Sequence, residues 1–247
     1  MGLAIVTGGS RGIGAAIAEK LAQDGHDVLI NCAASVEKAE AVAEKCRAYG
    51  VQAYVKQWDV ADYDACAAAL KEIKAEIGVP YILVNNAGIT RDGLMIRMKE
   101  DQFDAVIRTN LKGAFNMLSQ CGAMMMRAKQ GRIINITSMS AHLGFSEVVP
   151  YCTSKGAVLA MTRALAVEWA GDNITVNSIA PGWFRSKMNE QVVDAAREQK
   201  ILNRMPLHAY GDTRDLGKMA EFLVGDGASY ITGQDFAVDG GALAYGY

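Results

Sequence analysis

The sequence predicts an α/β protein with a single doubly wound parallel sheet of about seven strands and helices on both faces. Short apolar runs alternate with helical segments along the whole chain. Strands whose apolar residues are continuous, rather than alternating with polar ones, are typical of a parallel sheet buried on both faces. The length of 247 residues also suits one such sheet,.

The first half of the chain alternates strands and helices. Residues 3–7 form an apolar run that ends at a glycine-rich turn, after which Ile13, Ile17 and Leu21 recur at helical spacing,. Three more strands and two more helices follow. The strands are expected at residues 27–32, 51–57 and 81–85, and the helices at residues 36–49 and 62–77.

The second half continues this order up to the C-terminal residues. Residues 182–210 are the least regular stretch, and we expect a substrate lid over about residues 183–210,. No repeat or linker interrupts the chain, which predicts one domain over residues 1–247. Helices are expected at residues 99–108, 112–128, 149–170 and 213–223, and strands at residues 132–137, 174–179 and 235–238.

Composition excludes several classes of protein. A net charge of −2 and a pI near 6.0 are not those of a nucleic-acid-binding protein,. The five cysteines have no metal-ligand spacing, which predicts buried, reduced thiols and no metal site,. No charged leader precedes an apolar stretch, and no run of about 18 apolar residues occurs. We therefore expect a soluble, cytoplasmic protein without a membrane span.

The glycine-rich turn T-G-G-S-R-G-I-G spans residues 7–14, between the first strand and the first helix. Glycines at this place permit a tight turn and a close approach of the backbone to a pyrophosphate, and the start of a helix attracts the anion. A glycine turn can also be merely structural, but its position favours dinucleotide binding. The candidate binding residues are Gly8, Ser10, Arg11, Gly12, Ile13 and Gly14.

The end of the second strand indicates which dinucleotide is preferred. NAD-binding domains usually place an acid there to hold the ribose hydroxyls. Residues 31–35 read Asn-Cys-Ala-Ala-Ser, and the first acid is Glu37. The missing carboxylate, with Arg11 in the turn, favours NADP(H) over NAD(H), although Arg11 could instead be a solvated surface residue.

Tyr151 and Lys155 lie one helical turn apart, thirteen residues or more after Ser138. Side chains at positions i and i+4 of a helix are neighbours, so the Lys155 ammonium is expected beside the Tyr151 phenol. A free phenol has a pKa of about 10. We expect Lys155 to lower that pKa, so that Tyr151 exchanges a proton with a substrate oxygen.

Together these motifs resemble the short-chain dehydrogenase/reductase family over the whole chain, which implies a Rossmann-type fold and an oxidoreductase. The resemblance implies that Tyr151 is the general acid, that Lys155 holds the nicotinamide ribose, and that Ser138 binds the substrate oxygen. It implies that Asn110 holds a water that connects Lys155 to solvent. The motifs that carry it are Thr7–Gly14, Asp59-Val60, Asn85–Gly88, Asn110, Ile136–Ser138, Tyr151–Lys155 and Pro181-Gly182.

The resemblance also implies further contacts. Substrate contacts are expected at Ser138, Tyr151, Trp183 and His142, the last of which could equally be an exposed loop residue. Ser186 stands where the family usually has a threonine that meets the nicotinamide amide. The remaining cofactor contacts are expected at Asn31, Asp59, Val60, Asn86, Ala87, Gly88, Tyr151, Lys155, Pro181, Gly182 and Phe184.

Within the family, residues 85–98 resemble 3-oxoacyl-[acyl-carrier-protein] reductases of fatty acid biosynthesis and their acetoacetyl-CoA relatives, whereas residues 180–188 look more like gluconate-type dehydrogenases. Arg127, Lys129 and Arg132 could form a basic patch for an acidic carrier protein, but Asp172 has the wrong sign for it. A non-enzymatic nucleotide-binding protein is the remote alternative. The family resemblance, with two long apolar-faced helices, favours a homotetramer or homodimer.

Overall fold

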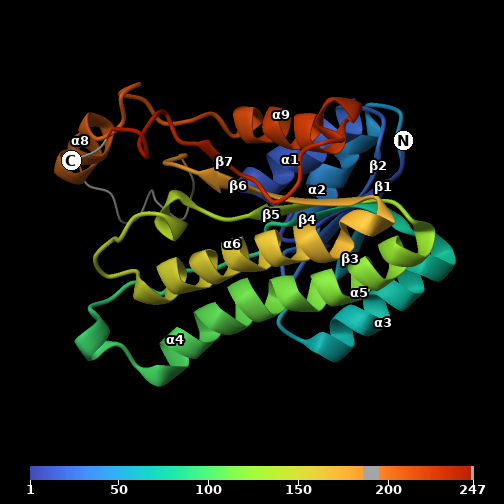
Figure 1. The fold of residues 1–247 in the computed structure, drawn as a ribbon, viewed down its shortest axis with the longest axis horizontal. Coiled ribbons are helices and arrows are strands. Elements are labelled where there is room, and N and C mark those ends of the chain that lie inside the picture. The colour runs from blue at the N-terminus through green and yellow to red at the C-terminus, as the bar shows by residue number, and fades with distance from the viewer. Residues whose placement is uncertain (186–194, 246–247) are drawn as a thin grey trace.

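Seven parallel strands form one sheet in the order β3-β2-β1-β4-β5-β6-β7 (Figure 1). A computed structural model describes residues 1–185 and 195–245. The predicted fold class is confirmed, and every end of a predicted strand lies within two residues of the observed end. The strands are β1 (Leu3–Val6), β2 (Asp27–Cys32), β3 (Ala53–Gln57), β4 (Pro80–Asn85), β5 (Gly131–Ile136), β6 (Ile174–Pro181) and β7 (Asp235–Val238).

Helices cover both faces of the sheet (Figure 1). One face carries α1 (Gly12–Gln23), α2 (Val36–Arg47) and α9 (Thr213–Val224), whose apolar residues share one core cluster. The other face carries α3 (Tyr63–Glu76), α5 (Gly113–Ala128) and α6 (Val149–Trp169), which share the second cluster. The described residues also form the helices α4 (Glu100–Val106) and α8 (Ala195–Asn203).

The apolar pattern of each element explains its burial. Ile82, Leu83 and Val84 of β4 point alternately to the two faces, and all three are fully buried,. Ile17 and Leu21 lie one turn apart on α1 and are also fully buried, which anchors this helix on the sheet,. Each such side chain contributes about 1.5–3 kcal/mol by leaving water.

A π-helical turn, η2 (Ile107–Lys112), joins α4 to α5. The sequence predicted two helices with a break between residues 108 and 112, and the structure places the π turn at that break. A π turn holds one more residue than an α turn and is frequent at functional sites. Here it carries Asn110, whose side chain is buried.

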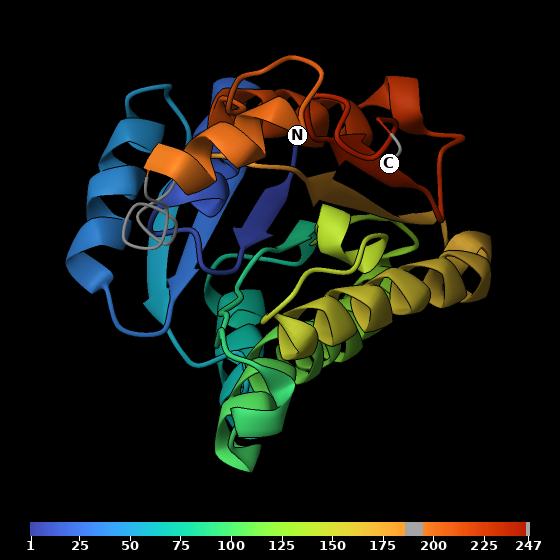
Figure 2. The ribbon, with the colours of Figure 1, turned by 90° about the vertical axis from the view of Figure 1, so that its left-hand side faces the viewer.

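The strand order reverses between β1 and β4, which are neighbours in the sheet. In doubly wound folds the ligand binds at this switch point, outside the carboxyl ends of the strands. The loop before α6, the start of α6 and α8 gather at the same end of the molecule (Figure 2). No helix in the described part of the chain is long and apolar enough to cross a membrane.

Candidate active site

Neighbouring amides hold the glycine-rich turn between β1 and α1. Gly8 has φ of 62° and donates its N–H to Asn31 Oδ1 at 3.3 Å. Asn86 Nδ2 donates to the carbonyls of Thr7 at 2.9 Å and Gly8 at 3.1 Å, and so ties the ends of β1 and β4 together at the switch point. A Cβ on Gly14 would lie 2.5 Å from Asn86 Nδ2, so only glycine lets helix and strand approach this closely,.

The start of α1 is open to an anion. Its N-cap, Arg11, makes no side-chain cap, and its first turn holds no acid. Gly12 has φ of 57°, and a Cβ there would meet no atom within 4 Å. The first backbone N–H groups of a helix have no partner within the helix and favour a phosphate. This open, uncapped end therefore fits the pyrophosphate of a dinucleotide.

The expected adenine side of the site is less simple. Asp59 and Arg11 are exposed, as a cofactor contact requires, whereas Asn31 is buried and its Nδ2 donates to the carbonyl of Trp58. The carbonyl of Val60 accepts from Asn116 Nδ2 at 2.8 Å. Asn31 and Val60 therefore fix the turn and the end of β3 through these bonds, and their cofactor contacts stay predictions.

Tyr151 and Lys155 lie together near the start of α6, as the four-residue spacing predicted. Lys155 Nζ lies 5.6 Å from the centre of the Tyr151 ring and donates to the carbonyl of Ile136 at 2.6 Å. Ser138 lies two residues after the end of β5 and forms a hydrogen bond with the Tyr151 phenol. The structure therefore brings Ser138, Tyr151 and Lys155 to one place.

The electrostatics differ from the prediction that Lys155 lowers the pKa of Tyr151. Burial raises the pKa of the Tyr151 phenol above its usual value, and the hydrogen bond with Ser138 only partly opposes this. Burial also lowers the pKa of Lys155 to about 8. The pKa of Tyr151 therefore shifts opposite to the predicted direction, because burial of the phenol is the largest contribution to it,. A raised pKa keeps the phenol protonated, as a general acid must be.

Asn110 joins this group through a hydrogen-bond network. Its Oδ1 accepts from the N–H of Ile89 at 2.8 Å, and its Nδ2 donates to the Ile89 carbonyl at 2.9 Å and to Ser154 Oγ at 3.1 Å. Ser154 Oγ in turn donates to the carbonyl of Tyr151 at 2.8 Å. A Cβ on Gly88 would lie 3.3 Å from Asn110 Oδ1, which is a tight contact, and 3.7 Å from Lys155 Nζ.

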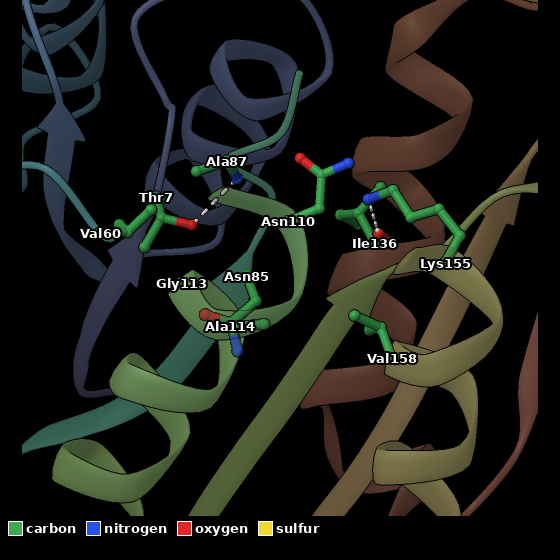
Figure 3. A pocket seen from close by; sticks show the side chains of 10 residues that line it. All are labelled: Thr7, Val60, Asn85, Ala87, Asn110, Gly113, Ala114, Ile136, Lys155 and Val158. Atoms are coloured by element: carbon green, nitrogen blue, oxygen red, sulfur yellow. Dashed lines mark hydrogen bonds between the residues drawn. The ribbon is translucent and has the colours of Figure 1, made fainter. Parts of the chain in front are cut away.

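A small cavity lies beside these residues (Figure 3). Its volume is about 10 Å³, and its polar side chains are those of Thr7, Asn85, Asn110 and Lys155. Figure 3 shows the Asn110 amide and the Lys155 ammonium turned toward one another. Asn85 Oδ1 is buried and has no hydrogen-bond partner in the described part of the chain. Room for about one water, with several polar neighbours, is what an internal water needs. The resemblance implies a water near this place.

The expected substrate side is formed by the loop after β5 and the residues after β6. His142 is exposed, but its Nε2 lies 2.5 Å from Asp235 Oδ2, so that only Nδ1 is left for a substrate. Trp183 is half-buried, whereas Phe184 packs in the core with the α1 face. Gly182 follows Pro181, the last residue of β6, and its N–H donates to the carbonyl of Val238 at 2.9 Å. Ser186 lies outside the described residues.

The predicted basic patch does not form. Arg132 is buried, donates to the carbonyls of Gly131 and Asn173, and stacks over the Tyr81 ring. Lys129 forms an ion pair with Asp172. Of the three predicted cations, only Arg127 is exposed with no ion pair to a described residue.

Sequence reasoning missed several residues that support this site. Thr7 Oγ1 accepts from the N–H groups of Asn86 and Ala87, and Ser154 links Asn110 to Tyr151. Both lie inside motifs that were noted, so their polar side chains were available as a signal. Asp235 stands in the last predicted strand and had no motif to mark it.

Comparison with known proteins agrees with this geometry. The chain matches the family described as short chain dehydrogenase over residues 2–197. It is 44% identical to 3-oxoacyl-[acyl-carrier-protein] reductase of Staphylococcus aureus over 96% of both chains. It is 39% identical to acetoacetyl-CoA reductase of Paracoccus denitrificans over 94% of this chain and 93% of that one. Its fold matches a gluconate 5-dehydrogenase from Burkholderia cenocepacia, solved with NADP and tartrate, with a TM-score of 0.94, 35% identity, and coverage of 98% and 95%.

Proposed function

This chain belongs to the short-chain dehydrogenase family, and we propose that it is an NADPH-dependent reductase that converts a 3-oxoacyl thioester into the 3-hydroxyacyl thioester. The observation that carries the proposal is the Ser138, Tyr151 and Lys155 group, with the phenol protonated and Lys155 within 5.6 Å of its ring. A non-enzymatic nucleotide-binding protein would have no need to keep this set together with Asn110.

The residues that would hold the cofactor are those of the open start of α1 and of the turn after β4. The glycine turn would bind the pyrophosphate, and the lack of a carboxylate in residues 31–35, together with exposed Arg11, would favour the 2′-phosphate of NADPH,. When bound, the cofactor supplies a hydride; the protein supplies orientation and a proton.

Tyr151 would donate its proton to the substrate carbonyl oxygen. Ser138 would donate a hydrogen bond to the same oxygen as negative charge develops there. Lys155 lies beside the Tyr151 ring, and burial lowers its pKa to about 8. It can therefore return a proton to the Tyr151 phenol near neutral pH. Asn110 would hold the water through which that proton arrives.

The substrate is proposed to be a thioester on the strength of the relatives at 44% and 39% identity. Between the two carriers, the ion pair of Lys129 with Asp172 and the burial of Arg132 reduce the positive charge of the patch predicted to bind an acidic carrier protein. A CoA thioester therefore fits this chain better than an acyl-carrier-protein thioester.

A sugar-acid dehydrogenase is the second candidate. Residues 180–188 resemble that group in sequence. Arg185 lies in this segment shortly after the end of β6, is exposed, and lies 3.1 Å from Glu198. A cation there would suit a substrate carboxylate.

The test is an assay of cofactor oxidation with the purified full chain. NADPH and NADH are each combined with acetoacetyl-CoA, an acetoacetyl-carrier-protein thioester and 5-ketogluconate. The proposal expects the highest kcat/KM for NADPH with acetoacetyl-CoA. Turnover of 5-ketogluconate alone would replace it with the second candidate, and no turnover with any pair would refute both.

We also propose a homodimer or homotetramer. Phe115 of α5 and Val167 of α6 are 50% and 84% exposed on the helices where the sequence predicted surplus apolar surface. Light scattering checks this, and a monomeric mass at micromolar concentration would contradict it.

A further inference from the structure

Asp235, the first residue of β7, is an acidic side chain that the proposed chemistry does not use. Its side chain is only 4% exposed. Oδ1 accepts from Thr137 Oγ1 at 2.8 Å and Ser178 Oγ at 2.5 Å, and Oδ2 lies 2.5 Å from His142 Nε2. Burying a carboxylate is costly unless donors surround it, and here three side chains do so.

Two of these three partners flank Ser138 in the chain. Thr137 is the residue just before it, and His142 closes the short helical turn η3 (Met139–Ala141) just after it. Asp235 lies two strands away, because β7 pairs with β6 and β6 pairs with β5. One carboxylate thus binds both ends of the turn that carries Ser138 and attaches that turn to the edge strand of the sheet.

We propose that Asp235 and His142 form a clamp that positions Ser138 against the substrate oxygen. Both are positioning residues, because they act through the turn and not on the reacting atoms. The role in turnover rests on the proposed function, in which Ser138 donates to that oxygen, whereas the holding of the turn rests on the contacts alone.

The Thr137 end of the turn is also attached to β6, because the N–H of Thr137 donates to the carbonyl of Ile179 at 2.8 Å, so the clamp matters most at the His142 end. Within it, Ser138 Oγ accepts from the N–H of Ser140 at 3.1 Å, and the N–H groups of Ala141 and Leu143 bond the carbonyls of Ser138 and Met139. These local bonds shape the turn but do not attach it to the sheet. A donor aimed at a developing charge loses much of its value when it shifts by about 1 Å, with rate losses of up to about 10²-fold.

The test compares His142→Ala with His142→Gln, whose amide N–H keeps a donor near the place of Nε2. His142 is at the surface, so neither variant should threaten folding, and melting curves check this. The clamp predicts that His142→Ala lowers kcat about tenfold, with the KM and the NADPH Kd changed less than about twofold. Asp172→Asn, which removes the acid of the exposed pair with Lys129, is the matched control and should keep wild-type kcat.

Amide hydrogen exchange of residues 138–145 in the same proteins gives a readout that does not depend on turnover. In His142→Ala, the N–H groups of Ala141 and Leu143 should exchange about tenfold faster, and in His142→Gln they should return toward wild type. Unchanged exchange in His142→Ala would overturn the clamp, even with a fall in kcat, because His142 would then be a substrate contact. Faster exchange in a protein that reduces no carbonyl would support the clamp while refuting the proposed function.

Discussion

The nucleotide side and the catalytic side of the site are built with different chemistry. Around β1 and β4, neutral groups hold the turn: the hydroxyl of Thr7 and the amides of Asn31 and Asn86. Around β5 and α6, the site depends on two groups that titrate, the half-buried Tyr151 and the buried Lys155. From this difference we expect cofactor binding to change less with pH than turnover does.

The largest effect should come from Tyr151→Phe, which removes the proton and leaves the nucleotide side intact. We expect kcat to fall by about 10³-fold, within the usual range for general acid catalysis, while the NADPH Kd measured by fluorescence stays within about twofold. Turnover near wild type would show that Tyr151 is not the general acid. A large loss of NADPH binding would show that the catalytic side also contributes to holding the cofactor.

Substitutions of one glycine on each side test how tightly the nucleotide side and the catalytic side are packed. In Gly14→Ala the new Cβ would lie 2.5 Å from Asn86 Nδ2 and 2.7 Å from the Gly8 carbonyl, whereas in Gly144→Ala it would meet no atom within 4 Å. We expect Gly14→Ala to lower the free energy of unfolding by about 1–3 kcal/mol and to weaken NADPH binding. Gly144→Ala should change stability by less than about 0.5 kcal/mol. Urea unfolding measures both, and equal losses would contradict the comparison.

The titration of Lys155 should be visible in stability. Its pKa is about 8 in the folded protein, against an ordinary lysine value of 10.5 in the unfolded chain. Between these values the unfolded chain binds more protons than the folded one, so the free energy of unfolding rises with pH, and below about pH 8 the buried charge lowers it throughout. Lys155→Met should lose this slope, which is of the order of 1 kcal/mol per pH unit.

Melting curves of wild type and Lys155→Met from pH 7 to about pH 10 measure that slope. Taking the difference between the two proteins cancels the surface groups they share. Parallel curves would show that Lys155 does not titrate in this range, and the catalytic side would then be no more sensitive to pH than the nucleotide side.

Asp172→Arg should change stability only slightly, because exposed ion pairs contribute about 0–1 kcal/mol. Its effect on substrate choice should be larger: Lys129 loses its acidic partner and a second cation joins it. We expect kcat/KM for a carrier-protein thioester to rise several-fold at low salt, with acetoacetyl-CoA unchanged. No change for either substrate would mean that this surface takes no part in carrier docking.

Much of this architecture could be predicted, because strand burial leaves a continuous apolar pattern and the glycine turn is local in sequence. The position of Lys155 beside Tyr151 could be predicted because their four-residue spacing is also local in sequence. What depends on three-dimensional packing could not be predicted. The desolvation that raises the pKa of Tyr151, the burial of Arg132 and the distant partner of His142 follow from elements far apart in the chain. The lid over residues 183–210 and the contact of Ser186 stay predictions.

The π turn at Ile107–Lys112 sets the rotation of α5 about its own axis relative to α4. Each residue of an α-helix advances the chain by about 100°, so one extra residue rotates α5 by that amount relative to α4. In that phase Met117, Cys121 and Met125 face the sheet and are fully buried. Deleting one residue from this turn would make α4 and α5 one continuous α-helix, but it would rotate the apolar face of α5 toward solvent. The packing of α5 on the sheet therefore also stabilises the π turn that carries Asn110.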